Sequence, residues 1–372
     1  MINRDKALFS IKKNLKAYPV VAILGPRQCG KSTLAKQIGA DYFFDLENPA
    51  DVNRLSEPQL VLESLQGLIV IDEVQRMPDL FPLLRYLVDN KKQKYLILGS
   101  ASRDLIRQSS ESLAGRIHYH ELGGFSLAEV GAASVHNLWL RGGYPRSFLA
   151  KTNEQSVLWR ENYVSTFLER DVPQLGIQIP AITLRRFWTM VSHYHGQVIN
   201  YSEIAGSFGI SDVTVKKYLD ILCGTFMLRQ LPPWHGNLKK RLVKSPKIYF
   251  RDTGLFHSLQ TINRFDDLMA HPKLGASWEG FAMHTLMRHL GFSAERFYFW
   301  GTHSGAELDL FWQNGGKNYG AEFKYSLQPK ITKSMLSAQN DLHLHHLSIL
   351  YPGKESYPIA KNVTVNALSD FT

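Results

Sequence analysis

The sequence predicts an α/β protein that begins with a doubly wound parallel sheet and continues into a helical region and a second α/β domain. Three observations predict this fold class. From residue 1 to about residue 130, short apolar runs alternate with helical patterns, as in a parallel sheet covered by helices. Residues 201–250 read as helix, turn and helix followed by two short strands. Residues 297–324 read as three strands separated by the turns HSG and NGG.

The length and composition describe a globular chain of several domains. A chain of 372 residues suggests two to four domains, and we expect them at 1–130, 131–180, 181–265 and 266–372, the second being a helical lid or connector. The N-terminus lacks the apolar core of a signal peptide, and the longest apolar runs are too short for a membrane span. The two cysteines are too few for a disulfide framework. We therefore expect a cytoplasmic protein without a membrane partner.

The first candidate site is the stretch GPRQCGKST at residues 25–33, which follows an apolar run and precedes a helical pattern. Strand, glycine loop and helix in this order are the context of a phosphate-binding loop. The glycines allow backbone N–H groups to face the phosphates, and the start of the helix adds partial positive charge. We expect Lys31 at the β- and γ-phosphates of ATP and Ser32 on Mg²⁺. The residues expected to contact the nucleotide here are Gly25, Gly30, Lys31, Ser32 and Thr33.

Two further strands are expected to complete this site. The run LIVIDE at residues 68–73 is an apolar strand that ends in two acids. Asp72 is expected to bind Mg²⁺ with Ser32, and Glu73 occupies the position of a general base that polarises water. The strand YLILGSAS at residues 95–102 ends in hydroxyl groups, so that Ser100 or Ser102 could sense the γ-phosphate. Simple turn chemistry explains these two serines equally well.

An arginine after this strand is a candidate for a contact between subunits. Arg116, in the sequence LAGR, could act in trans as an arginine finger on the nucleotide of a neighbouring subunit. Arg103 and Arg107 are alternatives, and a solvated surface arginine is the common outcome for any one of the three. The prediction implies a homo-oligomer that binds ATP between its subunits.

Residues 201–250 predict a winged helix, because a helix–turn–helix pattern is followed by two strands around a basic loop. Gly209 marks the turn and Ser211 is expected to cap the second helix. The chain has a formal net charge of +10, which favours an anionic partner, and nucleic acid is the first candidate. Phosphate contacts are expected from the lysines and the arginine of the second helix and the hairpin, which are Lys216, Lys217, Lys239, Lys240, Arg241, Lys244 and Lys247. The alternative is a winged helix that serves only for packing.

A second candidate site lies in the C-terminal third. Asp309 lies in the middle strand, and Glu322 and Lys324 alternate on the third strand and so share a face. Two carboxylates beside a lysine form a hard-oxygen site for Mg²⁺. Asp309 and Glu322 would bind the metal, Lys324 would orient or deprotonate a water molecule, and Glu279 on the preceding helix would complete the metal shell. The alternative is a solvated hairpin face. The histidines of HYH (193–195) and HLHH (343–346) are expected to be structural.

Taken together, GPRQCGKSTL, LIVIDEVQ, LILGSAS, LAGR, GGYP, RDTG and WEG…ELD…EFKYS resemble one widespread prokaryotic family over nearly the whole chain. Its members are AAA+-type ATPases with a C-terminal domain of formerly unknown function that is similar to PD-(D/E)XK nucleases, in particular to the archaeal Holliday-junction resolvase type. The resemblance implies ATP binding, a winged helix, oligomers, a restriction-endonuclease-like domain and a role on DNA. It assigns the ATP site to Gly25, Lys31, Ser32, Asp72 and Glu73. It assigns the nuclease-like site to Glu279, Asp309, Glu322 and Lys324.

The function expected from these sites is ATP-driven processing of branched or structured DNA, such as a four-way junction, by branch migration, by metal-dependent cleavage or by both. One alternative is a regulatory switch, in which ATP sets a conformational state, the winged helix binds an operator and the C-terminal domain is inactive. Another is an interaction scaffold whose basic surface meets an acidic protein or membrane lipid.

Overall fold

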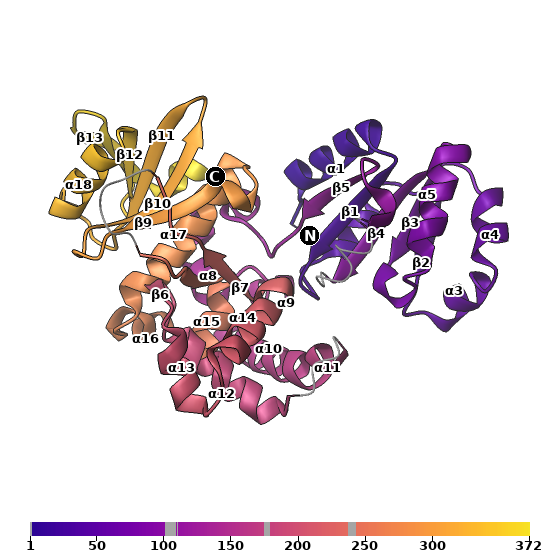
Figure 1. Ribbon diagram of the computed structural model, residues 1–372, viewed down its shortest axis with the longest axis horizontal. Helices are drawn as coiled ribbons and strands as arrows, with labels where there is room; N and C mark the ends of the chain where they lie inside the picture. Colours follow the sequence, from indigo (N-terminus) through magenta and orange to yellow (C-terminus); the bar gives the residue numbers. More distant parts are fainter. Residues whose placement is uncertain (1, 101–108, 110, 175–178, 237–242) are drawn as a thin grey trace. The chain divides into compact units, whose positions relative to one another are not determined.

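The computed structural model describes residues 2–100, 109, 111–174, 179–236 and 243–372. The chain divides into two compact units (Figure 1). Unit 1 consists of Met1–Gly124 and Gly224–Phe226, and unit 2 of Phe125–Cys223 and Met227–Thr372. The predicted boundary near residue 130 lies close to this division. The finer boundaries at residues 181 and 266 fall inside unit 2 and stay predictions.

Unit 1 contains the predicted doubly wound parallel sheet, which the structure confirms. Its five strands are β1 (Val20–Gly25), β2 (Tyr42–Asp45), β3 (Leu68–Asp72), β4 (Lys94–Ser100) and β5 (Ile117–Glu121). They lie in the order β2-β3-β4-β1-β5, and every neighbouring pair is parallel. Because β1, β4 and β3 are neighbours and run in the same direction, their carboxyl ends lie next to one another at one edge of the sheet.

Helices cover both faces of this sheet, and the alternation of side chains along β1 explains how. Val21 and Ile23 pack in one core with α1 (Asp5–Ala17) and α2 (Lys31–Lys36). Val20, Ala22 and Leu24 pack in the other core, and the helices that contribute buried residues there are α4 (Pro58–Ser64) and α5 (Leu80–Asn90). Leu55, which directly follows α3 (Pro49–Arg54), is buried in the same core. Every residue of β1 is buried, as expected of a central strand in a parallel sheet.

Unit 2 begins with a helical region that contains the predicted helix–turn–helix. Its helices include α7 (Leu127–Val130), α8 (Val135–Arg141), α9 (Pro145–Phe148), α10 (Asn153–Thr166), α11 (Val172–Gln174), α12 (Ala181–Ser192), α13 (Tyr201–Phe208) and α14 (Asp212–Gly224). Gly209 ends α13 with a φ of +62°, which a residue without Cβ adopts at low cost. The Ser211 hydroxyl accepts the Thr214 N–H at 3.2 Å and caps α14, as predicted. Val215, Leu219 and Leu222 of α14 are buried on one face.

The two strands after this helix pair are also present, but the loop between them is tied to another sheet. The strands β7 (Leu228–Leu231) and β8 (Lys247–Phe250) are antiparallel and form a small sheet with β6 (Gln197–Val198). The Phe299 N–H donates to the Pro232 carbonyl at 3.0 Å, and the Val243 N–H donates to the Gly301 carbonyl at 3.1 Å. The described ends of the loop therefore pair with β9 (Phe297–Gly301) of the C-terminal sheet.

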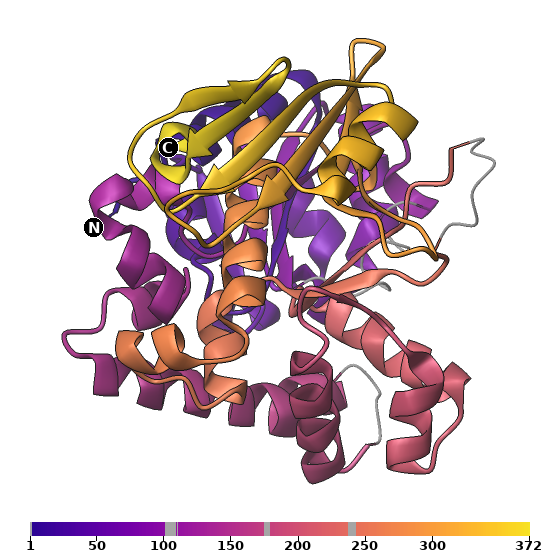
Figure 2. The same ribbon diagram turned by 90° about the vertical axis from the view of Figure 1, so that its left-hand side faces the viewer.

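The C-terminal sheet has six strands in the order β13-β14-β12-β11-β10-β9. The helices α15 (Thr253–Leu259), α16 (Phe265–Ala270) and α17 (Leu274–Leu290) lead into it. The predicted strands are confirmed as β9, β10 (Glu307–Asn314) and β11 (Lys317–Phe323), and each neighbouring pair of these three is antiparallel. They are followed by α18 (Lys333–Asp341), β12 (Leu344–Tyr351), β13 (Tyr357–Ala360) and β14 (Val363–Ala367). Figure 2 shows this orange and yellow sheet with α17 running beside it.

Two glycine motifs without predicted chemistry, GGYP and RDTG, pack against each other. The Asp252 carboxylate accepts the Gly143 N–H at 2.7 Å. Gly142 has a φ of +76°, and a Cβ added there would lie 2.1 Å from the Asp252 carboxylate. A Cβ added at Gly254 would lie 2.2 Å from the Arg141 carbonyl oxygen. The glycines of both motifs therefore allow two backbone segments to approach, and this role is structural.

Candidate functional site

The glycine loop of unit 1 connects β1 to α2, as the sequence predicts. Gly30 precedes the helix with a φ of +99°, in the left-handed region. A Cβ added at Gly25 would lie only 2.0 Å from the Leu122 carbonyl oxygen. Both glycines are therefore required by the geometry of the loop.

Lys31 is buried at the first position of α2, and its side chain turns back into the loop. Its ammonium donates to the carbonyl oxygens of Gly25 at 3.0 Å and Pro26 at 2.9 Å. The loop itself therefore holds the ammonium close to its own backbone. The contact between Lys31 and nucleotide phosphates stays a prediction. Thr33, two residues further along the helix, is exposed.

Asp72 ends β3 beside the start of α2, and the structure brings it together with Ser32. The Asp72 carboxylate is buried and accepts hydrogen bonds from the Ser32 hydroxyl and from the Glu73 N–H, the latter at 2.9 Å. Burial raises the pKa of Asp72, and the hydrogen bond from Ser32 and the charge of Lys31 oppose this shift. A hydroxyl and a carboxylate side by side are the oxygen ligands that suit Mg²⁺. The residues therefore fit the cation that accompanies a nucleotide in such loops.

Glu73 follows directly and has an unusual backbone conformation. Its φ of +55° lies in the left-handed region, which is uncommon for a residue other than glycine and often marks a functional position. Its carboxylate accepts a hydrogen bond from the side-chain amide of Gln75, a residue that sequence reasoning did not single out. The structure thus gives the predicted general base a fixed orientation next to Asp72.

The predicted sensor strand ends at the same edge of the sheet. Ser100 is the last residue of β4, and its Cα pairs with that of Gly25. The side chain of Ser100 lies outside the described part of the structure, as do Ser102, Arg103 and Arg107. A role for any of these residues toward a γ-phosphate stays a prediction.

Arg116 lies at the opposite end of the sheet from the glycine loop. It directly precedes β5, whose first residue pairs with Val20 at the start of β1. The Arg116 guanidinium forms two hydrogen bonds to the Asp89 carboxylate, at 2.6 and 2.9 Å. The hydrogen bond from Arg116 and the charge of its guanidinium lower the pKa of Asp89. Within its own chain Arg116 is therefore paired, and its role toward a neighbouring subunit stays a prediction.

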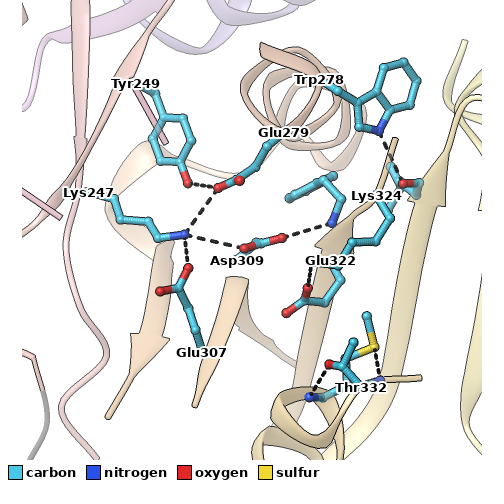
Figure 3. A network of polar contacts seen from close by, with 12 residues as sticks. Lys247, Tyr249, Trp278, Glu279, Glu307, Asp309, Glu322, Lys324 and Thr332 are labelled. Atoms are coloured by element: carbon cyan, nitrogen blue, oxygen red, sulfur yellow. Dashed lines mark hydrogen bonds and ion pairs between the residues drawn. The ribbon is translucent and has the colours of Figure 1, made fainter. Parts of the chain in front are cut away.

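The second predicted site forms a network of charged side chains in unit 2, which we call the acid–lysine cluster; Lys247, Glu279, Asp309 and Glu322 are its more buried members. It consists of Lys247, Tyr249, Glu279, Glu307, Asp309, Glu322 and Lys324 (Figure 3). The Asp309 carboxylate accepts the Phe323 N–H at 3.0 Å, which fixes β10 against β11. Lys324 donates to the Glu322 carboxylate at 2.7 Å. The structure therefore brings together the four residues predicted for this site, Glu279, Asp309, Glu322 and Lys324. The sequence did not indicate that Lys247, Tyr249 and Glu307 belong to the same network.

Lys247 corrects one prediction directly. The sequence places it among the exposed lysines of a basic wing, but its side chain is 2% exposed and comes from the central strand β8. Its ammonium contacts the carboxylates of Glu279 at 3.2 Å and Asp309 at 3.4 Å, and also that of Glu307. A buried ammonium costs several kcal/mol unless it is paired. Lys247 is therefore a buried counter-ion and does not contribute to a DNA-binding surface.

Burial and mutual repulsion perturb the acids of this cluster. Burial, and then the charge of Asp309, raises the pKa values of Glu279 and Glu322 above the ordinary value for a glutamate. Burial opposes protonation of Lys247, but the carboxylates of Glu279, Asp309 and Glu307 prevail and raise its pKa well above the ordinary value. Perturbed ionisable groups of this kind gather at functional sites more often than elsewhere.

The arrangement is not that of a formed metal site. Within the described residues, no three His, Cys, Asp or Glu side chains are grouped so that they could hold a metal ion. The predicted ligation of Mg²⁺ by Asp309 and Glu322 therefore does not fit the side chains as they stand. Lys247 lies among the carboxylates that such an ion would need.

Six other basic residues were predicted to contact DNA. Three of them are exposed, and three lie outside the part of the chain that the structure describes. Lys216 and Lys217 are exposed on α14, and Lys244 is exposed in the loop before β8. Lys239, Lys240 and Arg241 lie outside the described residues.

One histidine of the HYH segment has a position that agrees with the predicted structural role. His195 is completely buried, and its Nδ1 accepts the Phe250 N–H at 3.0 Å.

Comparison with known proteins identifies the class of protein to which the N-terminal domain belongs. Residues 17–131 match a family described as an AAA domain. Residues 132–266 match a domain of unknown function (DUF8612), and residues 274–371 match another (DUF4143). With the glycine loop, the buried Asp72 and the parallel sheet, the first match defines a P-loop ATPase, a class that uses a nucleotide and Mg²⁺. No helix of the described chain is long and apolar enough to cross a membrane.

The particular family follows from two curated relatives. The chain is 48% identical over 368 residues to uncharacterised protein Rv2008c of Mycobacterium tuberculosis and to uncharacterised protein Mb2031c of Mycobacterium bovis. Each alignment covers 98% of this chain and 83% of the relative. The chain therefore belongs to the family of these two mycobacterial proteins. Among solved structures, a Walker-type ATPase of Pyrococcus abyssi matches 70% of this chain and 96% of its own, with 14% identity and a TM-score of 0.48.

Proposed function

We propose that this P-loop ATPase acts on branched or otherwise structured DNA, such as a four-way junction, and couples ATP hydrolysis to remodelling of the DNA. The observation that carries the proposal is the acid–lysine cluster. It gathers Glu279 from α17, Asp309 from β10 and Glu322 from β11 in the same chain as a nucleotide site.

We interpret this cluster as a site for chemistry on phosphodiesters, because the stability of the fold alone does not account for it. Buried carboxylates are costly, and packed apolar side chains in their place are often as stable or more stable. The side chains as they stand do not form a metal site among the described residues. Strand cleavage is therefore proposed as a second activity without an assigned metal step, and it would depend on the carboxylate of Asp309.

DNA contact is supported by charge and exposure. The net charge is +10, and Lys216 and Lys217 are exposed on the second helix of the helix–turn–helix. Lysines of this kind contact phosphates and provide affinity without sequence choice. We further propose that ATP is bound between subunits of a homo-oligomer. Arg116 of one subunit would release Asp89 of its own chain and contact the nucleotide bound to the neighbouring subunit.

A regulatory switch is the second candidate. The buried Lys247 favours it, because an ammonium among the carboxylates is the arrangement expected of an inactive cluster. In this case ATP would set a conformational state and the helix–turn–helix would bind a cognate duplex. The switch predicts slow ATP turnover and sequence-selective binding, whereas the DNA-processing enzyme predicts a preference for DNA shape.

The deciding experiment combines labelled four-way junction and plain duplex with the purified protein in Mg²⁺ or Mn²⁺, with and without ATP. Lys31→Ala tests the ATPase and Asp309→Asn tests the cluster. A native gel reports changes in DNA structure, and a denaturing gel reports cut strands. Junctions that are resolved only with ATP and only by a chain with an intact Lys31 support remodelling. Nicks that disappear in Asp309→Asn support cleavage. Unchanged DNA in every lane contradicts the proposal and favours the switch.

A further inference from the structure

Lys247 reaches the acid–lysine cluster from a different part of the fold than the carboxylates. It is the first residue of β8, which belongs to the small sheet that follows the helix–turn–helix. Glu279 belongs to α17, and Glu307 and Asp309 belong to β10. Figure 3 shows the three carboxylates turned toward the single ammonium. Tyr249, two residues further along β8, points to the same side and donates to the Glu279 carboxylate at 2.5 Å.

The charges in the cluster are unequal. Four carboxylates, from Glu279, Glu307, Asp309 and Glu322, face two ammonium groups. Lys324 is paired with Glu322, whereas the carboxylates of Glu279, Glu307 and Asp309 all contact the ammonium of Lys247. Carboxylate oxygens gathered around one cation are the ligand set that Mg²⁺ and Mn²⁺ take from proteins. An ammonium and a divalent cation cannot occupy the same space, and their charges repel each other.

We propose that Lys247 is a built-in competitor for divalent cations, whose ammonium takes the place of a metal ion among the carboxylates and keeps the cluster closed to metal. The inference rests on the proposed function, since it takes the cluster as the site of phosphodiester chemistry. It explains why the carboxylates predicted to bind metal are present but are not grouped as metal ligands among the described residues.

The test measures metal binding rather than cleavage. Mn²⁺ binding to the full chain without nucleotide is followed by the loss of the free Mn²⁺ signal in electron paramagnetic resonance. Lys247→Met keeps an unbranched side chain that is one atom shorter and removes its charge, and Lys247→Arg keeps the charge. Each variant is combined with Asp309→Asn, so that binding elsewhere on the chain can be subtracted.

We expect the Asp309-dependent affinity for Mn²⁺ to rise at least about tenfold in Lys247→Met, because a charge repelling the metal at short range is removed. Lys247→Arg is expected to bind as weakly as the unaltered chain. Circular dichroism establishes that each variant is folded, and Lys247→Gln replaces Lys247→Met if the latter does not fold. Equal affinities in the folded neutral variant and the unaltered chain would overturn the proposal.

The two proposals can fail separately. Tighter Mn²⁺ binding in Lys247→Met without any cut DNA supports the competitor and contradicts cleavage. Asp309-dependent cuts by the unaltered chain, together with unchanged Mn²⁺ affinity in Lys247→Met, support cleavage and overturn the competitor.

Discussion

Two completely buried histidines should each remove stability from unit 2 as the pH falls from 7 to 5, whereas Glu279 and Glu322, whose pKa values are raised, act in the opposite direction. His195 accepts the Phe250 N–H through Nδ1, which only a neutral ring can do. The ring of His257 lies 2.9 Å from the Leu140 carbonyl oxygen and 2.7 Å from the Ser277 hydroxyl. Burial lowers the pKa of each histidine from 6.5 to about 3.

The sign and size of the effect follow from these values. Between pH 6.5 and 3 each of these histidines binds a proton in the unfolded chain but not in the folded chain, so its contribution to the free energy of unfolding falls as the pH falls. Each pH unit in this window corresponds to about 1.4 kcal/mol per histidine. From pH 6.5 to 5 the loss is therefore roughly 2 kcal/mol for each residue and about 4 kcal/mol for the pair.

The assay is urea unfolding followed by tryptophan fluorescence at a series of pH values. All seven tryptophans lie in unit 2, so the signal reports that unit selectively. His257→Gln is the matched variant, because glutamine keeps a neutral polar side chain and cannot titrate. Between pH 6.5 and 5, the slope of its unfolding free energy against pH should be smaller than that of the unaltered chain by the equivalent of about one proton. An identical pH dependence in the variant and the unaltered chain would refute the assigned protonation state of His257.

Three further outcomes are expected. Lys31→Ala should abolish ATP hydrolysis in a phosphate-release assay while the melting temperature changes little, and retained hydrolysis would contradict the assignment of the loop. Gly254→Ala should destabilise the chain, because its Cβ would meet the Arg141 carbonyl oxygen at 2.2 Å, whereas Gly206→Ala in the open middle of α13 should stabilise it by up to about 1 kcal/mol. Thermal unfolding of both variants checks the pair, and equal shifts would contradict the packing of the two glycine motifs. Lys217→Ala should weaken binding to any DNA and reduce the slope of log affinity against log salt by about one, and an unchanged slope would exclude a phosphate contact by this lysine.

Local patterns predicted most of the fold and the nucleotide site. The apolar runs that end in GPRQCGKST and LIVIDE are consecutive strand and loop signals, and the chain folds them as β1 and β3 with Lys31, Ser32 and Asp72 at one edge of the sheet. The capped helix at Ser211 and the strands β9 to β11 were predicted for the same reason. In each case the residues that decide the structure are close together in the sequence.

The parts that sequence reasoning missed depend on contacts between distant residues. Lys247 lies close in sequence to exposed basic residues, and its partners Glu279 and Asp309 are 32 and 62 positions away. One local signal was available, because Lys247 opens the strand KIYF, in which every residue is buried. Arg116 and Asp89 are 27 positions apart, and nothing in either segment indicates their pairing.

The most direct test of the proposed function is the rate of ATP hydrolysis with and without four-way junction DNA, at low and at moderate salt. Action on structured DNA predicts that the junction raises the rate more than duplex of equal length does. It also predicts that added salt removes the stimulation, because the contacts are made to phosphates. If the purified chain hydrolyses ATP at the same rate with junction, with duplex and without DNA at low salt, ATP hydrolysis is not coupled to DNA.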